Sequence, residues 1–339
     1  MTVAAQPSVS AVYRLIRCLL VLALSVPVPL SASPNGPETA QEWLHQLAPA
    51  MNMTSYRGVF VYSRGDQVSS MKVAHRYRHG EVEERLVRQD GESGEIIRKG
   101  TRVFCVLPER GQVQLNQIIP SGPFAEAFNR QLMPVSEWYV PVKLEDDRVA
   151  GHKTVQIALN ARDANRYSYR LWLEKKTGLL VKSEVRSTSD TVLEKFQFTS
   201  LELTADLSDK EFEIRSETPL SVADSSFAHL PDSPLPAADG WKLGWHPDGF
   251  APAATPRAGH HQAVAFSDGL AGFSVFVEPL GPVKMPTGAS RIGATTVYMR
   301  RVAVADRDFL VTVVGEVPPA TAMKVAKSVI IDHRLGQGD

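Results

Sequence analysis

The stretch YSYRLWLEKKTGLLVKSEV, residues 167–185, decides the fold of its surroundings. Two runs rich in β-branched and aromatic residues flank a turn at Lys176-Thr177-Gly178, which is the pattern of a β-hairpin. Successive side chains of a strand point to opposite sides of the sheet. One side of the first strand carries Tyr167, Tyr169, Leu171 and Leu173, and the other carries Arg170, Trp172 and Glu174. The sheet is therefore predicted to have an apolar, concave face.

Similar runs, separated by short turns, lie on both sides of this hairpin and predict an antiparallel sheet. They are Tyr56–Tyr62, Met71–Tyr77, Glu83–Arg88, Glu95–Lys99, Arg102–Leu107, Lys153–Leu159 and Leu193–Leu203. Apolar residues at helical spacing predict one helix in ETAQEWLHQLAPAM, residues 38–51, and a second that starts at the capping residue Ser121.

A proline-rich stretch without periodicity, residues 216–239, is typical of a linker. Beyond it we expect a small α+β domain over residues 240–333, after a larger β domain over residues 35–215. Its predicted strands are Trp241–Phe250, Gln262–Phe266, Gly272–Glu278, Thr295–Val304 and Phe309–Val314, and its closing helix is Pro318–Ile330. The row Phe273, Val275 and Val277 is predicted to face this helix, which leaves Phe276 among polar side chains.

The first 32 residues have the organisation of a secretory signal peptide. Arg14 and Arg17 precede the apolar run Cys18–Val26, and small residues follow at positions 31–33. This run is well short of the roughly 20 apolar residues that span a bilayer, so a retained anchor is disfavoured. We therefore expect an exported and soluble mature chain.

Charge and cysteine content narrow the partners and the bonds of that chain. The 339 residues include 37 basic and 37 acidic ones, and removal of the predicted signal peptide leaves 35 against 37. This balance indicates no nucleic-acid partner. Cys105 is then the remaining cysteine, so we expect no internal disulfide and interpret Cys105 as a buried structural thiol.

The sequence carries no strong signature of catalysis, of a metal centre or of a cofactor. A G-x-S-x-G elbow, a P-loop, a G-x-G-x-x-G turn and paired C-x-x-C motifs are missing. His75 and His79 fall on a strand that runs into a turn, and His260-His261 fall in a loop, so neither pair predicts a metal site. Glu83-Glu84 and Asp146-Asp147 are interpreted as solvated turn or edge charges. We expect a binding protein, with no enzymatic activity and no cofactor.

Two sets of residues are candidates for binding. Arginines on neighbouring hairpins could form a cationic rim for phosphate or carboxylate groups, although interleaved glutamates equally suit an exposed mixed-charge face. Aromatic side chains could line a cavity for an acyl chain, or could be plain core. The resulting lipid set is Phe60, Phe104, Phe128, Trp138, Trp172, Phe198, Arg76 and Arg78, and the partner-binding set is Phe276, Tyr298, Arg300 and Glu278.

Several motifs, in this order, resemble those of the RseB/MucB family of periplasmic regulators of the envelope-stress sigma factor. They are YRLWLEKKTGLLVKSEV, LEKFQFTSL, WHPDGF, SDGLAGFSVFVEP and VTVVGEVPPATAMKVAKSV, and they span nearly the whole mature chain. The C-terminal SDGLAGFSVFVEP and VVGEVPPATA are the most specific. The first domain by itself is similar to the wider class of periplasmic lipoprotein carriers, which is an analogy of fold.

The resemblance implies a half-open antiparallel β-barrel with helices, joined to a smaller sheet-and-helix domain, in a periplasmic protein without enzymatic activity. It implies binding to the periplasmic segment of a membrane-spanning anti-sigma factor of RseA/MucA type, which is thereby shielded from the site-1 protease. Lipopolysaccharide or another lipid would release that partner. A periplasmic lipid or lipoprotein carrier is the alternative function, and a homo-oligomer is left open. Phe276 is interpreted as a partner anchor or as packing against the first domain.

Overall fold

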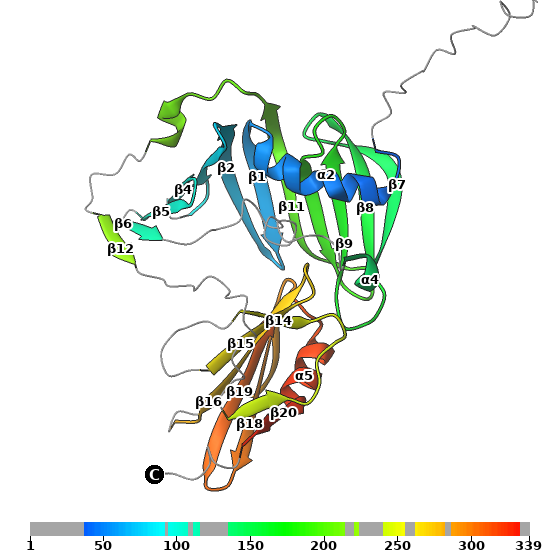
Figure 1. Cartoon of the computed structure of the whole chain (residues 1–339), viewed down its shortest axis with the longest axis vertical. Helices are drawn as coiled ribbons and strands as arrows, with labels where there is room; N and C mark the ends of the chain where they lie inside the picture. The colour runs from blue at the N-terminus through cyan, green and yellow to red at the C-terminus, as the bar shows by residue number, and fades with distance from the viewer. Residues whose placement is uncertain are drawn as a thin grey trace, which may run out of the picture. The chain divides into compact units, whose positions relative to one another are not determined.

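The computed structural model describes residues 37–91, 94–107, 111–115, 135–213, 220–223, 240–254, 262–281 and 286–332 (Figure 1). The predicted signal peptide, the second predicted helix and Phe128 lie outside the described residues. Most of the predicted linker also lies outside them, apart from residues 220–223. We refer to the described residues up to 223 as the large-sheet lobe and to those from 240 as the small-sheet lobe.

Helix α2, Ala40–Met53, begins two residues after the start of the helix predicted over residues 38–51. The hydroxyl of Thr39 accepts a hydrogen bond from Glu42 N at 3.2 Å, and the Glu42 carboxylate accepts one from Thr39 N at 3.0 Å. This capping box satisfies donors that the first turn of a helix leaves open. The buried side of the helix carries Trp43, Leu44, Leu47 and Met51, as its apolar spacing predicts.

Twelve strands of the described residues form one sheet, in the order β12-β6-β5-β4-β3-β2-β1-β11-β10-β9-β8-β7. Their bounds are β1 Tyr56–Arg64, β2 Gln67–Arg78, β3 Glu81–Arg88, β4 Glu95–Lys99, β5 Arg102–Leu107, β6 Gly111–Leu115, β7 Tyr139–Val149, β8 His152–Ala161, β9 Ser168–Glu174, β10 Leu180–Arg186, β11 Val192–Leu203 and β12 Leu220–Ala223. The short helices α4, Val135–Trp138, and η1, Asp209–Phe212, accompany the sheet.

The sheet does not close on itself, because its outermost strands β12 and β7 do not pair with each other. Neighbouring strands are antiparallel except for β12, which comes from the predicted linker and pairs in parallel with β6. Helix α2 lies across the sheet (Figure 1). Its buried residues share one core with Tyr56, Val73, Phe196 and Phe198. The predicted half-open antiparallel sheet is confirmed, and we call the side that carries this core the inner face.

The small-sheet lobe has a six-stranded antiparallel sheet in the order β14-β15-β16-β19-β18-β17. The bounds are β14 Ala251–Ala254, β15 Gln262–Ser267, β16 Gly272–Pro279, β17 Gly288–Ile292, β18 Thr295–Val304 and β19 Arg307–Gly315. Helix α5, Pro319–Ser328, buries Ala322, Val325 and Ala326 in one core with the predicted row Phe273, Val275 and Val277. This lobe therefore has the predicted sheet-and-helix architecture.

Two predicted boundaries in the small-sheet lobe are wrong. The segment 241–250 is not one strand, because it contains β13, Trp241–Leu243, and a turn before β14. Pro247 lacks the N–H that a strand needs, and Gly249 has a positive φ of 84°. The helix predicted to Ile330 ends at Ser328, since Val329–Ile331 form β20 and pair with β13.

Strands β7 and β17 were not predicted, for one common reason. Both form outer edges of their sheets, where one side of the strand has no neighbour and a regular apolar alternation is not required. Strand β7 contains the charged run LEDDR, and all five residues of β17 are exposed. Neither segment therefore shows the hydrophobic periodicity from which a strand is predicted.

Candidate functional site

The inner face of the large sheet brings together part of the predicted lipid set. Phe60 on β1 pairs with Phe198 on β11, and their ring centroids are 5.9 Å apart. Phe196 lies 5.0 Å from Phe60 and 5.4 Å from Phe198. Phe198 is buried, whereas Phe60 is half-buried at the edge of the core that α2 covers. These rings form one aromatic cluster on the inner face.

Four other members of the lipid set lie on the opposite face, which we call the outer face. Trp172 pairs with Lys182, which pairs with Gln197, so Trp172 and the inner-face residue Phe196 are on different sides. Lys182 lies over the Trp172 ring at 3.7 Å, and Asp147 accepts from Trp172 Nε1 at 2.8 Å. The register likewise places Phe104, Arg76 and Arg78 on the outer face. The structure thus divides the predicted set between two faces.

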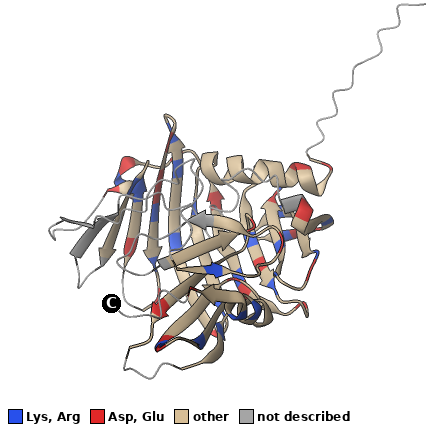
Figure 2. Ribbon diagram, turned by 60° about the horizontal axis from the view of Figure 1, so that its bottom comes forward, with Lys and Arg blue, Asp and Glu red and all other residues tan. Residues whose placement is uncertain are grey.

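The arginines at this end of the sheet are neutralised by carboxylates. Arg76 is 3% exposed, binds Glu83 and Asp209, and stacks over Phe212 at 4.6 Å. Arg78 binds Asp209 at 2.7 Å, and Arg85 binds Glu95. Figure 2 shows Lys and Arg interspersed with Asp and Glu over the ribbon. The mixed-charge interpretation therefore holds for these residues, and they do not form an unpaired cationic rim.

Glu84 is not the solvated charge that the sequence predicted. It is 7% exposed, and its carboxylate lies 3.1 Å from Nδ1 of the fully buried His75. The second ring nitrogen of His75 lies 3.1 Å from the carbonyl oxygen of Asn52, near the end of α2. The His75 ring also stacks on Tyr56, with ring centroids 5.0 Å apart. His75 therefore links the end of α2 to the inner face of the sheet. The prediction that His75 and His79 form no metal site remains a prediction.

Trp138, the last cavity candidate, belongs to a contact between the two lobes. It lies against Arg166, whose guanidinium is 5.1 Å from the Trp138 ring and 5.1 Å from the Phe250 ring. Gly249 fits against Trp138 because it has no side chain: a Cβ there would lie 2.2 Å from the indole. Trp138 therefore contacts the WHPDGF motif.

Arg166 and Asp268 form the centre of this contact, and both side chains are fully buried. Arg166 Nη1 donates to Asp268 Oδ2 at 2.7 Å, and Arg166 also binds Asp163 and the carbonyl oxygen of Asp248. The Tyr139 hydroxyl donates to Asp268 Oδ2 at 3.0 Å. Burial, together with Tyr169 and Asp268 nearby, raises the pKa of Tyr139 well above its usual range, so the phenol keeps its proton. The SDGLAG motif thus positions a carboxylate for the large-sheet lobe.

A second contact between the lobes surrounds Glu194 at the start of β11. Its carboxylate accepts from the Tyr62 hydroxyl, from Arg64 Nε at 3.2 Å and from Ala294 N at 2.9 Å. Arg64 also donates to the Thr295 hydroxyl, beyond the turn between β17 and β18. Arg166, Asp268, Glu194 and Glu316 were not predicted as site residues. The pair Arg166–Asp268 spans 102 positions, and the donors to Glu194 lie 100 to 132 positions away from it.

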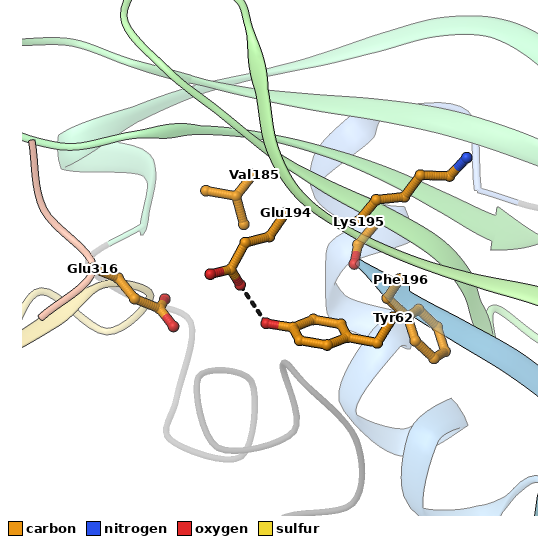
Figure 3. A pocket seen from close by; sticks show the side chains of 7 residues that line it. Tyr62, Val185, Glu194, Lys195, Phe196 and Glu316 are labelled. Atoms are coloured by element: carbon orange, nitrogen blue, oxygen red, sulfur yellow. Dashed lines mark hydrogen bonds between the residues drawn. The ribbon is translucent and has the colours of Figure 1, made fainter. Parts of the chain in front are cut away.

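A pocket opens beside this second contact (Figure 3). It is lined by Tyr62, Ser183, Val185, Glu194, Lys195, Phe196 and Glu316, and its volume is about 320 Å³ including solvent at its mouth. Burial raises the pKa of Glu316, and the negative charge of Glu194 raises it further. The pocket reaches the aromatic cluster of the inner face only at Phe196.

The structure divides the partner-binding set as well. Phe276 pairs with Thr312 while Tyr298 pairs with Val313, so these two side chains lie on opposite faces of the small sheet. Glu278 shares the face of Phe276, and Arg300 shares that of Tyr298. Tyr298 packs against the core that α5 covers, whereas Phe276 is half-buried on the other side. Phe276 and Tyr298 therefore do not form one surface on the small sheet.

The described residues contain no group of three or more His, Cys, Asp or Glu side chains that could hold a metal ion. Among the helices of these residues, none has the length and apolarity that crossing a membrane requires. Cys105 is half-buried, and burial raises the pKa of its thiol.

Comparison with known proteins gives two matches to family models, which follow the two lobes. The MucB/RseB N-terminal domain matches residues 39–215, and the MucB/RseB C-terminal domain matches residues 236–330. The chain belongs to the MucB/RseB family. The predicted resemblance is thereby confirmed, while the domain boundaries at single-residue detail stay a prediction.

Relatives in the MucB/RseB family are named as regulatory proteins. The sigma factor AlgU regulatory protein MucB of Pseudomonas aeruginosa is 33% identical over 308 residues, which cover 86% of this chain and 90% of that protein. The sigma-E factor regulatory protein RseB of Escherichia coli K12 is 24% identical over 315 residues, or 88% and 93% of the two chains.

Solved structures of MucB extend the comparison to three dimensions. MucB in the Pseudomonas aeruginosa MucA/MucB complex has a TM-score of 0.70 and 30% identity, and the match covers 86% of this chain and 99% of that one. MucB in complex with MucA(peri) has a TM-score of 0.69 over the same shares. A structure of MucB itself has a TM-score of 0.60 at 29% identity. The fold of the MucB/RseB family therefore extends over both lobes.

Proposed function

We propose that this chain is a periplasmic regulator that binds the periplasmic segment of a membrane-spanning anti-sigma factor and shields it from site-1 proteolysis. The observation that carries the proposal is the match to MucB in complex with MucA(peri), at 30% identity and over 99% of that chain. The match covers both lobes, so a binding surface of MucB on either lobe has a matching region in this chain. This supports the proposal that the present chain binds a similar partner. The predicted export signal supports a periplasmic location.

Binding is tested by titrating the chain with a purified periplasmic fragment of an anti-sigma factor of MucA type in a calorimeter. We expect a saturable complex at micromolar concentrations or below. The matched control is the same fragment with its residue order scrambled. Heat changes no larger than those of the scrambled fragment would contradict the proposal.

Shielding is a separate property and needs its own measurement. The fragment is incubated with a site-1 protease, with and without a stoichiometric excess of this chain, and intact fragment is followed by mass spectrometry. We expect slower cleavage in the complex, because a bound segment must first dissociate before it can enter the protease. Equal cleavage rates at a saturating concentration of this chain would contradict the proposed shielding but not the proposed binding.

The two faces of the small sheet allow a test of where the partner contacts this lobe. Phe276→Ala removes a half-buried ring from the face that α5 does not cover, whereas Tyr298→Ala removes a ring packed on the core. We propose that the partner covers the Phe276 face, so Phe276→Ala should weaken binding about tenfold or more at unchanged unfolding temperature. Tyr298→Ala should lower the unfolding temperature. Wild-type affinity in Phe276→Ala would show that the partner contacts other residues.

Release by lipopolysaccharide or another lipid is proposed for the inner face, beside the half-buried Phe60. Helix α2 already covers much of this face, so a lipid tail would have to enter next to the helix. Phe60→Ala is compared with Trp172→Ala, which removes a ring from the outer face. We expect Phe60→Ala to raise the lipid concentration that displaces the fragment, and Trp172→Ala to leave it unchanged. Lipid that binds and passes to membrane vesicles, without any fragment binding, would instead favour the carrier function.

A further inference from the structure

Glu194 on the large-sheet lobe and Glu316 on the small-sheet lobe line the same pocket, and their environments differ. Glu194 is buried, and three donors point at its two oxygens. That arrangement suits a carboxylate anion, which can only accept hydrogen bonds. Glu316 lies directly after β19, and its backbone N donates to the carbonyl oxygen of Gly272 at 2.9 Å. The position of Glu316 is thus set by the small sheet.

The Glu316 carboxyl group accepts no hydrogen bond from the residues that the structure describes. Figure 3 shows both carboxyl groups in one pocket, with Glu194 bound to Tyr62. The charged and titratable groups around them are Arg64 and Tyr62 from β1, Lys195 from β11, and the phenols Tyr167 and Tyr169 at β9. Lys195 directs its ammonium group away from the carboxyls (Figure 3), and Arg64 is already bound to Glu194 and Thr295. Glu316 consequently faces a negative charge that Arg64 offsets only in part.

The turn that carries Ala294 holds the two lobes close at this point. Gly293 has a positive φ of 59°, and a Cβ on it would lie 2.6 Å from both Arg64 Cγ and Glu194 Oε1. Its neighbour Ala294 is fully buried, and its N–H binds Glu194. A change in the environment of Glu194 therefore acts directly on a backbone N–H of the small-sheet lobe.

We propose that Glu194 and Glu316 form a pH-sensitive joint between the lobes, which tightens when Glu316 takes up a proton. Protonation removes the repulsion between two carboxylates and turns Glu316 into an O–H donor for a carboxylate acceptor. The joint concerns the chain by itself and does not depend on the proposed function.

The sign of the pH dependence follows from linkage. The pKa of Glu316 is raised above its ordinary value of 4.5 in the joined state, by burial and by Glu194. When the lobes separate at this contact, Glu316 is solvated and its pKa returns towards the ordinary value. Protonation thus favours the joined state: the extra stability is fully present below 4.5 and is lost as pH rises through the raised pKa. Each unit by which the pKa is raised changes the joining equilibrium about tenfold.

Hydrogen exchange of the β17–β18 turn measures the joint in the full chain. Protection of peptides that contain Ala294, corrected for intrinsic exchange at each pH, is compared at acidic and at mildly alkaline pH. We expect severalfold greater protection at the acidic pH. Glu316→Gln imitates the protonated group and should show high protection at both, whereas the control Asp306→Asn, an exposed acid on the same lobe, should keep the wild-type dependence.

Wild-type protection that is equal at both pH values, or a Glu316→Gln variant that keeps the wild-type pH dependence, would overturn the joint. If Glu316→Gln does not fold, the proposal is tested on the wild-type chain by a carbon-13 NMR titration of its glutamate carboxyl groups. We expect one glutamate to titrate above the ordinary value in step with the protection of Ala294. A titration curve in which every glutamate is ordinary would equally refute the inference.

Discussion

The contact between Arg166 and Asp268 makes a sharp prediction about stability. Asp268 uses all its acceptor capacity: Oδ2 accepts from Arg166 at 2.7 Å and Tyr139 at 3.0 Å, and Oδ1 accepts from the N–H groups of Leu270 at 2.9 Å and Ala271 at 2.8 Å. In Asp268→Asn one oxygen becomes an NH₂ group, which faces donors in either orientation. Two donors therefore lose their acceptor, and Arg166 loses a buried counter-charge.

The expected loss can be worked from these contacts. One hydrogen bond to a charged group contributes about 1.5–3 kcal/mol and a neutral one about 1 kcal/mol. Removal of one partner from a buried ion pair costs about 3–5 kcal/mol, because the other charge stays buried. Asp163 still binds Arg166 and keeps the loss towards the lower end. We expect Asp268→Asn to lower the free energy of unfolding by about 3 kcal/mol.

Urea unfolding followed by tryptophan fluorescence measures this loss. The matched control is Asp308→Asn, which breaks the exposed ion pair with Arg301 and should change the unfolding midpoint little. If Asp268→Asn loses less than about 1 kcal/mol, or no more than Asp308→Asn, the buried pair is not formed in solution. The contact between the lobes would then need a different explanation.

The remaining predictions concern single positions. Gly249→Ala should destabilise the chain far more than Gly91→Ala in the same urea assay. Both glycines have a positive φ, which costs about 1 kcal/mol of backbone strain for alanine, but only at Gly249 would the added Cβ lie 2.2 Å from the Trp138 ring. Equal losses would contradict the packing of Trp138. Burial raises the pKa of the Cys105 thiol above its ordinary 9.0, so without the predicted signal peptide the chain should react with iodoacetamide at pH 8 more slowly than free cysteine. A rate matching free cysteine would show that the thiol is solvated in solution.

Much of the sheet was accessible from the sequence because strands with one buried side carry a regular alternation. The hairpin of residues 167–185 illustrates this: Leu171 and Leu173 are fully buried, and the pairing of Trp172 with Lys182 places Trp172 on the predicted other side. Strands β7 and β17 were not predicted, because a strand at an outer edge of a sheet does not require that alternation. The segment 241–250 was wrongly predicted as one strand, because its apolar residues are divided between β13 and a turn.

Candidate sites were harder to predict than strands. Phe60 and Phe198 lie together in the structure, but the aromatic and basic character of Trp172, Phe104 and Arg76 does not reveal which face of the sheet they occupy relative to distant strands. That choice depends on register across several strands, and a shift of one residue reverses it. The same reason separates Phe276 from Tyr298.

Local patterns alone determined that this chain is a two-part antiparallel β protein with a helix on each part, and its motifs identified the MucB/RseB family. The pairing of Arg166 with Asp268, and the approach of Glu316 to Glu194, were decided only by the tertiary structure. The physical reason is distance along the chain. Periodicity reports which side of an element is apolar, whereas a buried charge acquires its partner only when segments more than 100 positions apart pack together.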